Sequence, residues 1–193
     1  MRRCAVGLRR ATGVLSRLRS AEGRAMVKDA PKDAQKQAVL AELRRARANL
    51  LAAIEGLAPS DMLRAGVVGF WSVKDVLAHL TVWESELVTA LSRLDRPSQV
   101  PHIVQIEDID EFNAEQYRIN APRPLELVLE DFHGVHKHLL RAVEALDERT
   151  LTDVRKFRWL EGEPLTYLIA DCAYWHEDEH AEQIRQWRAA QGL

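Results

Sequence analysis

The chain of 193 residues contains few cysteines and no long apolar stretch. Its two cysteines, Cys4 and Cys172, are too few for the disulfide framework of a small secreted protein, so we expect a cytoplasmic protein. No apolar run approaches the roughly 20 residues that a membrane-spanning helix requires, and we expect no membrane partner. No segment alternates apolar and polar residues over a strand length, which argues against a β-sheet. These absences together favour an all-α protein.

Positive charge is concentrated at the start of the chain. Residues 1–25 contain seven arginines and one acid, Glu22, whereas the whole chain has 27 basic and 29 acidic residues. The remainder is therefore acidic, which argues against a nucleic-acid partner. We expect residues 1–30 to be a basic extension: sequence upstream of a true start at Met26, a targeting segment, or a basic arm. Residues 31–193 are predicted to form the folded domain.

Four segments have the apolar spacing of amphipathic helices. The first runs from Pro31 to Gly56, the second opens at the capping box Ser72–Asp75 and ends before Pro97, the third starts near Pro124 and reaches Leu146, and the fourth runs from Pro164 to Trp187. Residues 58–70 and 151–164 are predicted to be loops. Residues 95–122 form a long connection with a helical piece around Ile109 to Ile119. This pattern predicts a four-helix bundle with a long crossover between the second and third helices.

The fourth helix contains a pattern known from metalloproteases. His176-Glu177-Asp178-Glu179-His180 matches H-E-x-x-H, the zinc-binding helix of one class of these enzymes. The longer form of the motif needs Gly at 183 and His at 186, but both positions are Gln. Only thirteen residues follow His180, too few for a glutamate ligand on a further helix. The protease class is therefore excluded.

The two histidines still need partners, because they replace apolar residues in the core-facing stripe of the helix. A buried polar group without a hydrogen-bond partner costs roughly 1–3 kcal/mol, and a divalent metal ion would satisfy both rings. The best third ligand is His79, which shares the inward face of the second helix with Val76 and Trp83. We therefore predict a metal site of His79, His176 and His180. Three protein ligands leave coordination positions open, as in catalytic sites.

Two motifs resemble those of DinB/YfiT-like proteins, and the ClbS/DfsB-like branch is the most similar. The motifs are Trp71-Ser72-Val73-Lys74-Asp75-Val76-Leu77-Ala78-His79-Leu80 followed by Trp83-Glu84, and His176-x-x-Glu179-His180-x-x-Gln183-Ile184-Arg185-x-Trp187. The resemblance covers about residues 32–190. It implies a bundle in up-down-down-up order and a metal held by one histidine of helix two and two of helix four, here His79, His176 and His180. A homodimer is a further expectation in such a family.

Several other residues have two interpretations. Glu84, Glu177 and Glu179 are weak candidates for a catalytic base, although a solvent-facing charge is the preferred role for Glu177 and Glu179. Trp83 and Cys172 are expected to line a pocket, and Cys172 is either a soft fourth ligand or a core residue. A further group on helix three is expected to form a partly exposed polar edge without a third metal ligand: His133, His136 and His138.

The resemblance implies a divalent-metal-dependent enzyme that acts on a small electrophilic or thiol-conjugated molecule. The reaction would be of transferase, isomerase or hydrolase type, in detoxification, resistance or stress response. The metal would be Zn, Ni, Fe, Mn or Co, with a low-molecular-weight thiol as a candidate cosubstrate. The alternative is a non-enzymatic bundle that binds or sequesters a small molecule, with a structural metal or none.

Overall fold

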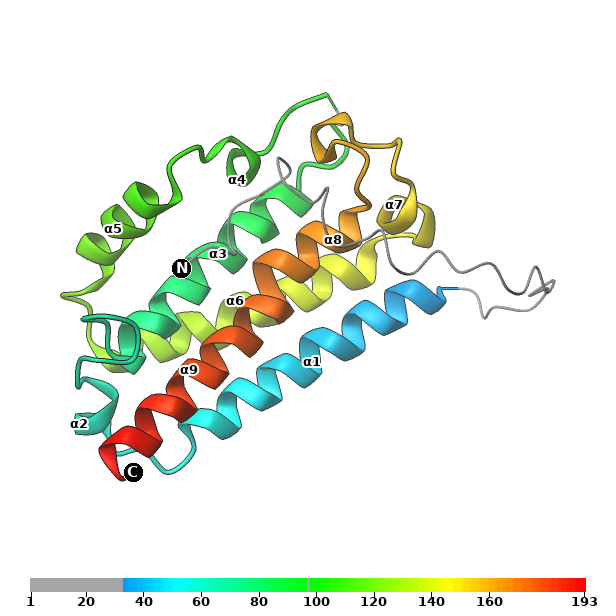
Figure 1. The fold of residues 1–193 in the computed structure, drawn as a ribbon. Helices are drawn as coiled ribbons and strands as arrows, with labels where there is room; N and C mark the ends of the chain where they lie inside the picture. Colours follow the sequence, from blue (N-terminus) through cyan, green and yellow to red (C-terminus); the bar gives the residue numbers. More distant parts are fainter. Residues whose placement is uncertain (1–32, 97) are drawn as a thin grey trace, which may run out of the picture.

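A computed structural model describes residues 33–96 and 98–193, and within these ranges the chain forms helices and no sheet (Figure 1). The prediction of an all-α fold is confirmed. The expected basic extension, residues 1–30, lies outside the described residues. The four long helices are α1 (Ala34–Ile54), α3 (Val73–Leu91), α6 (Leu125–Ala145) and α9 (Trp175–Gln191).

Short helices occupy the connections. They are α2 (Pro59–Met62), α4 (His102–Gln105), α5 (Ile109–Asn120), α7 (Glu148–Thr152), the 3-10 turn η2 (Arg158–Leu160) and α8 (Leu165–Ile169). The position of α5 agrees with the helical piece predicted around Ile109 to Ile119. The loop predicted at 58–70 contains the short helix α2, and the connection predicted at 151–164 contains the end of α7 and η2. Helices of three to five residues are too short to produce a recognisable apolar period.

The start of α3 follows from a local hydrogen-bond pattern that the sequence predicts. The Ser72 side chain accepts a hydrogen bond from the Asp75 backbone N–H, and Oδ2 of Asp75 accepts one from the Ser72 backbone N–H at 2.9 Å. This capping box satisfies two backbone donors that the first turn of a helix leaves free. It therefore fixes the residue at which α3 begins and with it the face that His79 occupies.

The long helices form a square bundle. In Figure 1, α1 and α9 run in one direction, and α3 and α6 run in the other. Helix α3 packs on α6 and α1 packs on α9, while contacts of α1 with α6 and of α3 with α9 close the square. Because consecutive long helices α3 and α6 are parallel, the chain has to return along the bundle between them. Helices α4 and α5 belong to this return segment, and both pack on α3.

The bundle interior is apolar at both ends. One cluster is centred on Leu43, Leu87 and Leu139, all fully buried, and the other on Leu50, Leu80 and Phe132. Both clusters draw residues from α1, α3 and α6, and α9 adds Ala181, Ile184 and Trp187 to the second, so every long helix contributes apolar residues to the interior. The polar residues that lie among them therefore stand out, and they form the sites described below.

The fourth predicted helix is not a continuous α-helix. It consists of α8, a π-helical turn η3 (Ala170–Tyr174) and α9. Single π turns inside α-helices are rare and occur frequently at functional sites. This one ends two residues before His176. Cys172 of this turn lies in the apolar core, and the following helix α9 packs on both α1 and α3.

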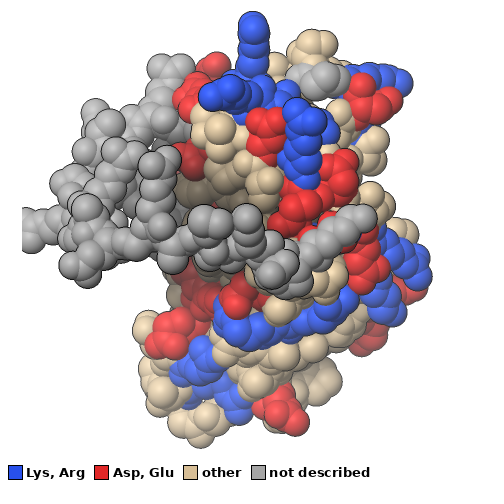
Figure 2. Space-filling model, turned by 90° about the vertical axis from the view of Figure 1, so that its right-hand side faces the viewer, with Lys and Arg blue, Asp and Glu red and all other residues tan. Residues whose placement is uncertain are grey.

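The surface of the bundle carries mixed charge. On the face drawn in Figure 2, basic and acidic side chains are interspersed over the described residues. Exposed ion pairs such as Arg44–Glu144 at 3.0 Å and Arg45–Asp178 at 2.6 Å illustrate this pattern. None of the helices in the described ranges is both long and apolar enough to cross a membrane.

Candidate metal centre

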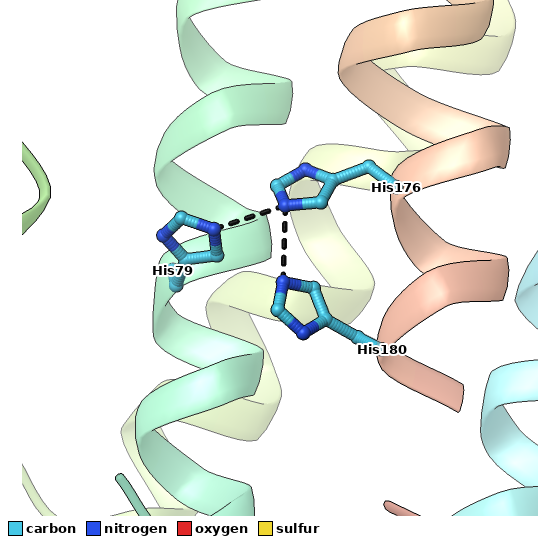
Figure 3. A group of neighbouring side chains, drawn as sticks. All are labelled: His79, His176 and His180. Atoms are coloured by element: carbon cyan, nitrogen blue, oxygen red, sulfur yellow. Dashed lines mark hydrogen bonds between the residues drawn. The ribbon is translucent and has the colours of Figure 1, made fainter. Parts of the chain in front are cut away.

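The three predicted histidines meet between α3 and α9. Figure 3 shows His79 on α3 and His176 and His180 on α9 with their rings converging. The Nε2 atom of His176 lies 2.9 Å from Nε2 of His79 and 3.0 Å from Nε2 of His180. His176 and His180 are buried, whereas His79 is partly exposed. The triad thus has one side open to solvent, at His79.

Protons alone cannot satisfy the three Nε2 atoms. The other ring nitrogen of His180, Nδ1, lies 2.8 Å from Oε1 of Gln183, which can only accept, so Nδ1 carries the proton and Nε2 of His180 offers a lone pair. A neutral His176 has at most one proton on Nε2 to share between two neighbouring nitrogens. A cation would accept all three lone pairs at once. Three nitrogens bound tetrahedrally to one ion at 2.0–2.1 Å are about 3.3 Å apart, close to the separations found here.

Burial keeps the triad uncharged, as metal ligation requires. It lowers the pKa of His180 to about 4 and holds the pKa values of His79 and His176 well below the ordinary value of 6.5. The positive charge of a protonated neighbour would lower the pKa of His79 and His176 further. Neutral imidazole is the form that binds metal ions, so the rings are ready to bind a metal at neutral pH.

The metal-free protein should therefore lose stability as the pH falls. The unfolded chain takes up protons on histidine at about pH 6.5, whereas the folded triad takes them up only at much lower pH. Above pH 6.5 neither state binds these protons, and below it the unfolded state binds more, so the free energy of unfolding decreases with falling pH. Urea unfolding in a chelating buffer between pH 7.5 and 5.5 would measure this decrease. The decrease should be smaller in His180→Gln, and an equal decrease would contradict the role of this ring.

A second buried polar group lies in the bundle core, and each long helix contributes one residue to it. We call Arg47 of α1, Glu84 of α3, His136 of α6 and Glu177 of α9 the Arg47 cluster; all four are buried. Nη2 of Arg47 donates to Oε2 of Glu84 at 2.9 Å and lies 2.6 Å from Oε1 of Glu177. Nδ1 of His136 lies 3.0 Å from Oε1 of Glu84. The cluster therefore links all four helices at one level.

The guanidinium of Arg47 is held on several sides. Its Nη1 donates to the backbone carbonyl of Phe132 at 2.8 Å, and its central carbon lies 3.6 Å from the centroid of the Phe132 ring. Ligand atoms of Glu84, His136 and Glu177 lie within 4.8 Å of one another, a spacing that would suit a metal ion. The guanidinium already pairs with both carboxylates, so the cation of this cluster is Arg47.

Three expectations are corrected by the Arg47 cluster. Glu177 does not face solvent: its side chain is fully buried, and this burial raises its pKa, an effect that Arg47 opposes. Glu84 contacts Arg47 and His136 rather than the histidine triad. His136 is buried instead of lying on an exposed edge.

The other candidate residues have different surroundings. Cys172 is 1% exposed in the apolar core, where burial holds its pKa well above the ordinary value, so its thiol stays protonated and is a poor ligand. Glu179 is partly exposed, and its carboxylate lies 3.5 Å from the Gln183 amide. Trp83 packs beside the triad, with ring centroids 6.3 Å from His79 and 6.5 Å from His176.

A narrow cleft adjoins the triad between α3 and α5, and its enclosed space of about 10 Å³ has room for about one water molecule. His79 belongs to its lining, and Trp71, rather than the predicted Trp83, supplies the tryptophan wall. The ring of Trp71 lies 5.0 Å from that of His79, centroid to centroid. The side of the triad that is open to solvent therefore borders a narrow cleft that opens between α3 and α5.

Fold and site together define a class of protein: a helical bundle with a buried histidine triad built on two facing helices. The family model described as the DinB superfamily matches residues 42–184, and the chain belongs to this superfamily. No curated protein matches the chain. A solved structure of an uncharacterised protein from Escherichia coli UTI89 is similar in fold, with a TM-score of 0.69, 13% identity and coverage of 82% of this chain and 95% of that one. At this level of identity the similarity supports the fold alone.

Proposed function

We propose that this protein is a divalent-metal-dependent enzyme whose metal is held by His79, His176 and His180. The observation that carries the proposal is the convergence of three uncharged imidazole nitrogens beside a cleft. Structural zinc sites are normally closed by four protein ligands, whereas catalytic sites keep a position free. The triad offers three ligands, and within the described residues no fourth His, Cys, Asp or Glu joins this group.

The residues around the triad would have different roles at this metal centre. Gln183 accepts the Nδ1 proton of His180 and so keeps the Nε2 lone pair directed at the triad. Trp83 and Trp71 flank His79 and exclude water from two sides of the rings. A bound divalent ion would lower the pKa of a water or thiol ligand to near neutrality and so provide a nucleophile.

The nearby acids are consistent with a nucleophile that the metal itself generates. Glu84 and Glu177 both pair with Arg47, and the carboxylate of Glu179 lies against the amide of Gln183. None of the three candidate bases therefore contacts the triad. We infer a substrate that is a small electrophile, attacked by water or by a low-molecular-weight thiol, in a cytoplasmic reaction of the kind that the ClbS/DfsB-like resemblance implies.

The same observation also favours a second function from a different class. A triad without a neighbouring general base could hold a metal that only binds a small molecule, and the bundle would then sequester that molecule without turnover. The cleft at His79 would serve this role equally well. The two functions differ in whether bound ligand is converted.

Metal content and turnover test the proposal in sequence. The full-length protein without a histidine tag should contain about one equivalent of metal after exposure to Zn²⁺, Ni²⁺ or Mn²⁺, measured by mass spectrometry of the elements. Less than about a tenth of an equivalent would refute both the enzyme and its metal centre. The loaded protein is then assayed with chlorodinitrobenzene and a panel of biological thiols. Turnover that is lost in His79→Ala supports the enzyme, and stoichiometric binding without turnover supports sequestration.

A further inference from the structure

The cleft beside His79 has an unusual lining on its α5 side. Helix α5 contributes Asn113, Gln116, Tyr117 and Asn120, all uncharged side chains that can form hydrogen bonds. Their spacing of three, four and seven residues places them on one face of the helix. The opposite wall comes from α3 and the turn before it. The wall that α5 provides is therefore polar but carries no charge.

Some of these groups are used within the protein and others are not. Oδ1 of Asn113 accepts a hydrogen bond from Nε1 of Trp83 at 3.1 Å, and Nδ2 of Asn120 donates to the backbone carbonyl of Gln116 at 2.9 Å. The side chain of Gln116 forms no hydrogen bond with any other described residue. Asn113 and Asn120 are thus fixed in place, while the Gln116 carboxamide is available to a ligand.

The one charged side chain of the lining outside the triad is Asp75, and its charge is already engaged. Its Oδ2 accepts hydrogen bonds from the backbone N–H and the hydroxyl of Ser72, at 2.9 and 2.7 Å. Its Oδ1 lies 3.6 Å from Nζ of Lys74. Lys74 in turn donates to the backbone carbonyl of Ala121 at 2.5 Å. No basic side chain lines the cleft to bind a carboxylate or phosphate.

We propose that this cleft selects an uncharged part of the substrate, one that presents a hydrogen-bond donor and acceptor side by side, such as a carboxamide. Gln116 would pair with it through both its N–H and its carbonyl oxygen. The enclosed space of the cleft is about 10 Å³, room for about one water molecule, so the carboxamide would lie across the mouth of the cleft against the partly exposed Gln116 while the reactive atom reaches the metal at His79. This inference rests on the proposed metal-dependent function and narrows its substrate class.

A matched pair of thiols tests the selection. 3-Mercaptopropionamide and 3-mercaptopropionate have nearly the same shape, and each can bind Co²⁺ in the loaded full-length protein through sulfur, which is read from the sulfur-to-cobalt absorption band. The preference for the amide, expressed as the ratio of the two Kd values, should fall about tenfold in Gln116→Leu, the worth of a lost pair of hydrogen bonds. Comparing the same ratio between variants cancels the intrinsic difference between the two thiols. An unchanged ratio would overturn the proposal.

Two further variants guard against a misfolded protein. Gln116→Lys should shift the preference towards the carboxylate, a gain that loss of folding cannot produce. Glu115→Gln, on the exposed side of the same helix, should leave the ratio unchanged. A gain that fails to appear in Gln116→Lys, or an equal change in Glu115→Gln, counts against the proposal.

The proposed function can fail separately from this inference. If the Co²⁺ spectrum shows that no metal binds, the enzyme proposal fails. The cleft is then tested in metal-free protein by saturation-transfer NMR with propionamide and propionate. Transfer to propionamide that is lost in Gln116→Leu supports the selection of an uncharged amide, and equal transfer to both compounds overturns it.

Discussion

Arg47→Ala is expected to lower the free energy of unfolding by about 3–5 kcal/mol, the cost of removing one partner from a buried ion pair. The substitution leaves Glu84 and Glu177 in the core with no cation beside them, and both side chains are fully buried. It also removes the hydrogen bond to the Phe132 carbonyl and the stacking on the Phe132 ring. Urea unfolding of wild type and variant at pH 7.5 measures the difference.

The chain offers a close control for this substitution. Arg45, two residues earlier on α1, pairs with Asp178 on the same helix α9, but its side chain is 48% exposed. Arg45→Ala should cost no more than about 1 kcal/mol, as exposed ion pairs do. The triple variant Arg47→Met, Glu84→Gln, Glu177→Gln should recover most of the stability, because no buried charge is then left alone. Similar losses for the two arginines would show that the Arg47 cluster contributes nothing special.

His79→Ala is expected to weaken zinc binding by at least about 100-fold. Changes in residues that only support metal ligands cost roughly 10–100-fold in affinity, and His79 supplies one of three ligand atoms in the proposed site. It is also the only one of the three that α3 provides, so its loss leaves two nitrogens on one helix. Competition with a chromophoric zinc chelator gives the two dissociation constants.

His138→Ala provides the matched control for this measurement. His138 lies exposed on α6 and is not part of the triad. The substitution removes the same kind of side chain as His79→Ala does. The zinc affinity of the His138→Ala variant should stay within about twofold of wild type, since an isolated surface histidine is a weak site. Equal affinities for wild type and His79→Ala would refute the triad as the metal site, even if the protein contained zinc.

The triad could be predicted because its histidines stand where apolar residues belong. His176 and His180 are four apart and share one side of a helix, and His79 continues the stripe of Val76 and Trp83. The same reasoning, applied to every stripe, would also have found the Arg47 cluster. Arg47 stands between Leu43 and Leu50, Glu84 between Leu80 and Leu87, and His136 between Phe132 and Leu139. Charged residues were assigned to the surface by type rather than by position.

Two other features could not be predicted from the spacing of apolar residues. The buried side of α9 is wide enough to include both His176, which faces α3, and Glu177, which contacts Arg47 on α1. That width depends on α9 packing against two helices at once, a tertiary fact that a single helical wheel does not contain. The π turn η3 likewise cannot be recognised from its sequence, because its five residues, ADCAY, would also suit an α-helix.

Helix α5 lines the cleft but is not one of the bundle helices that carry the triad. The triad and the Arg47 cluster are built from bundle helices, where a substitution disturbs packing on all sides. Helix α5 lies in the crossover, packs chiefly on α3 and buries only Asn120. Its inner face can therefore change during evolution at little cost to the core. If the cleft binds substrate as proposed, its specificity can therefore change through substitutions in one peripheral helix while the bundle and the triad stay the same.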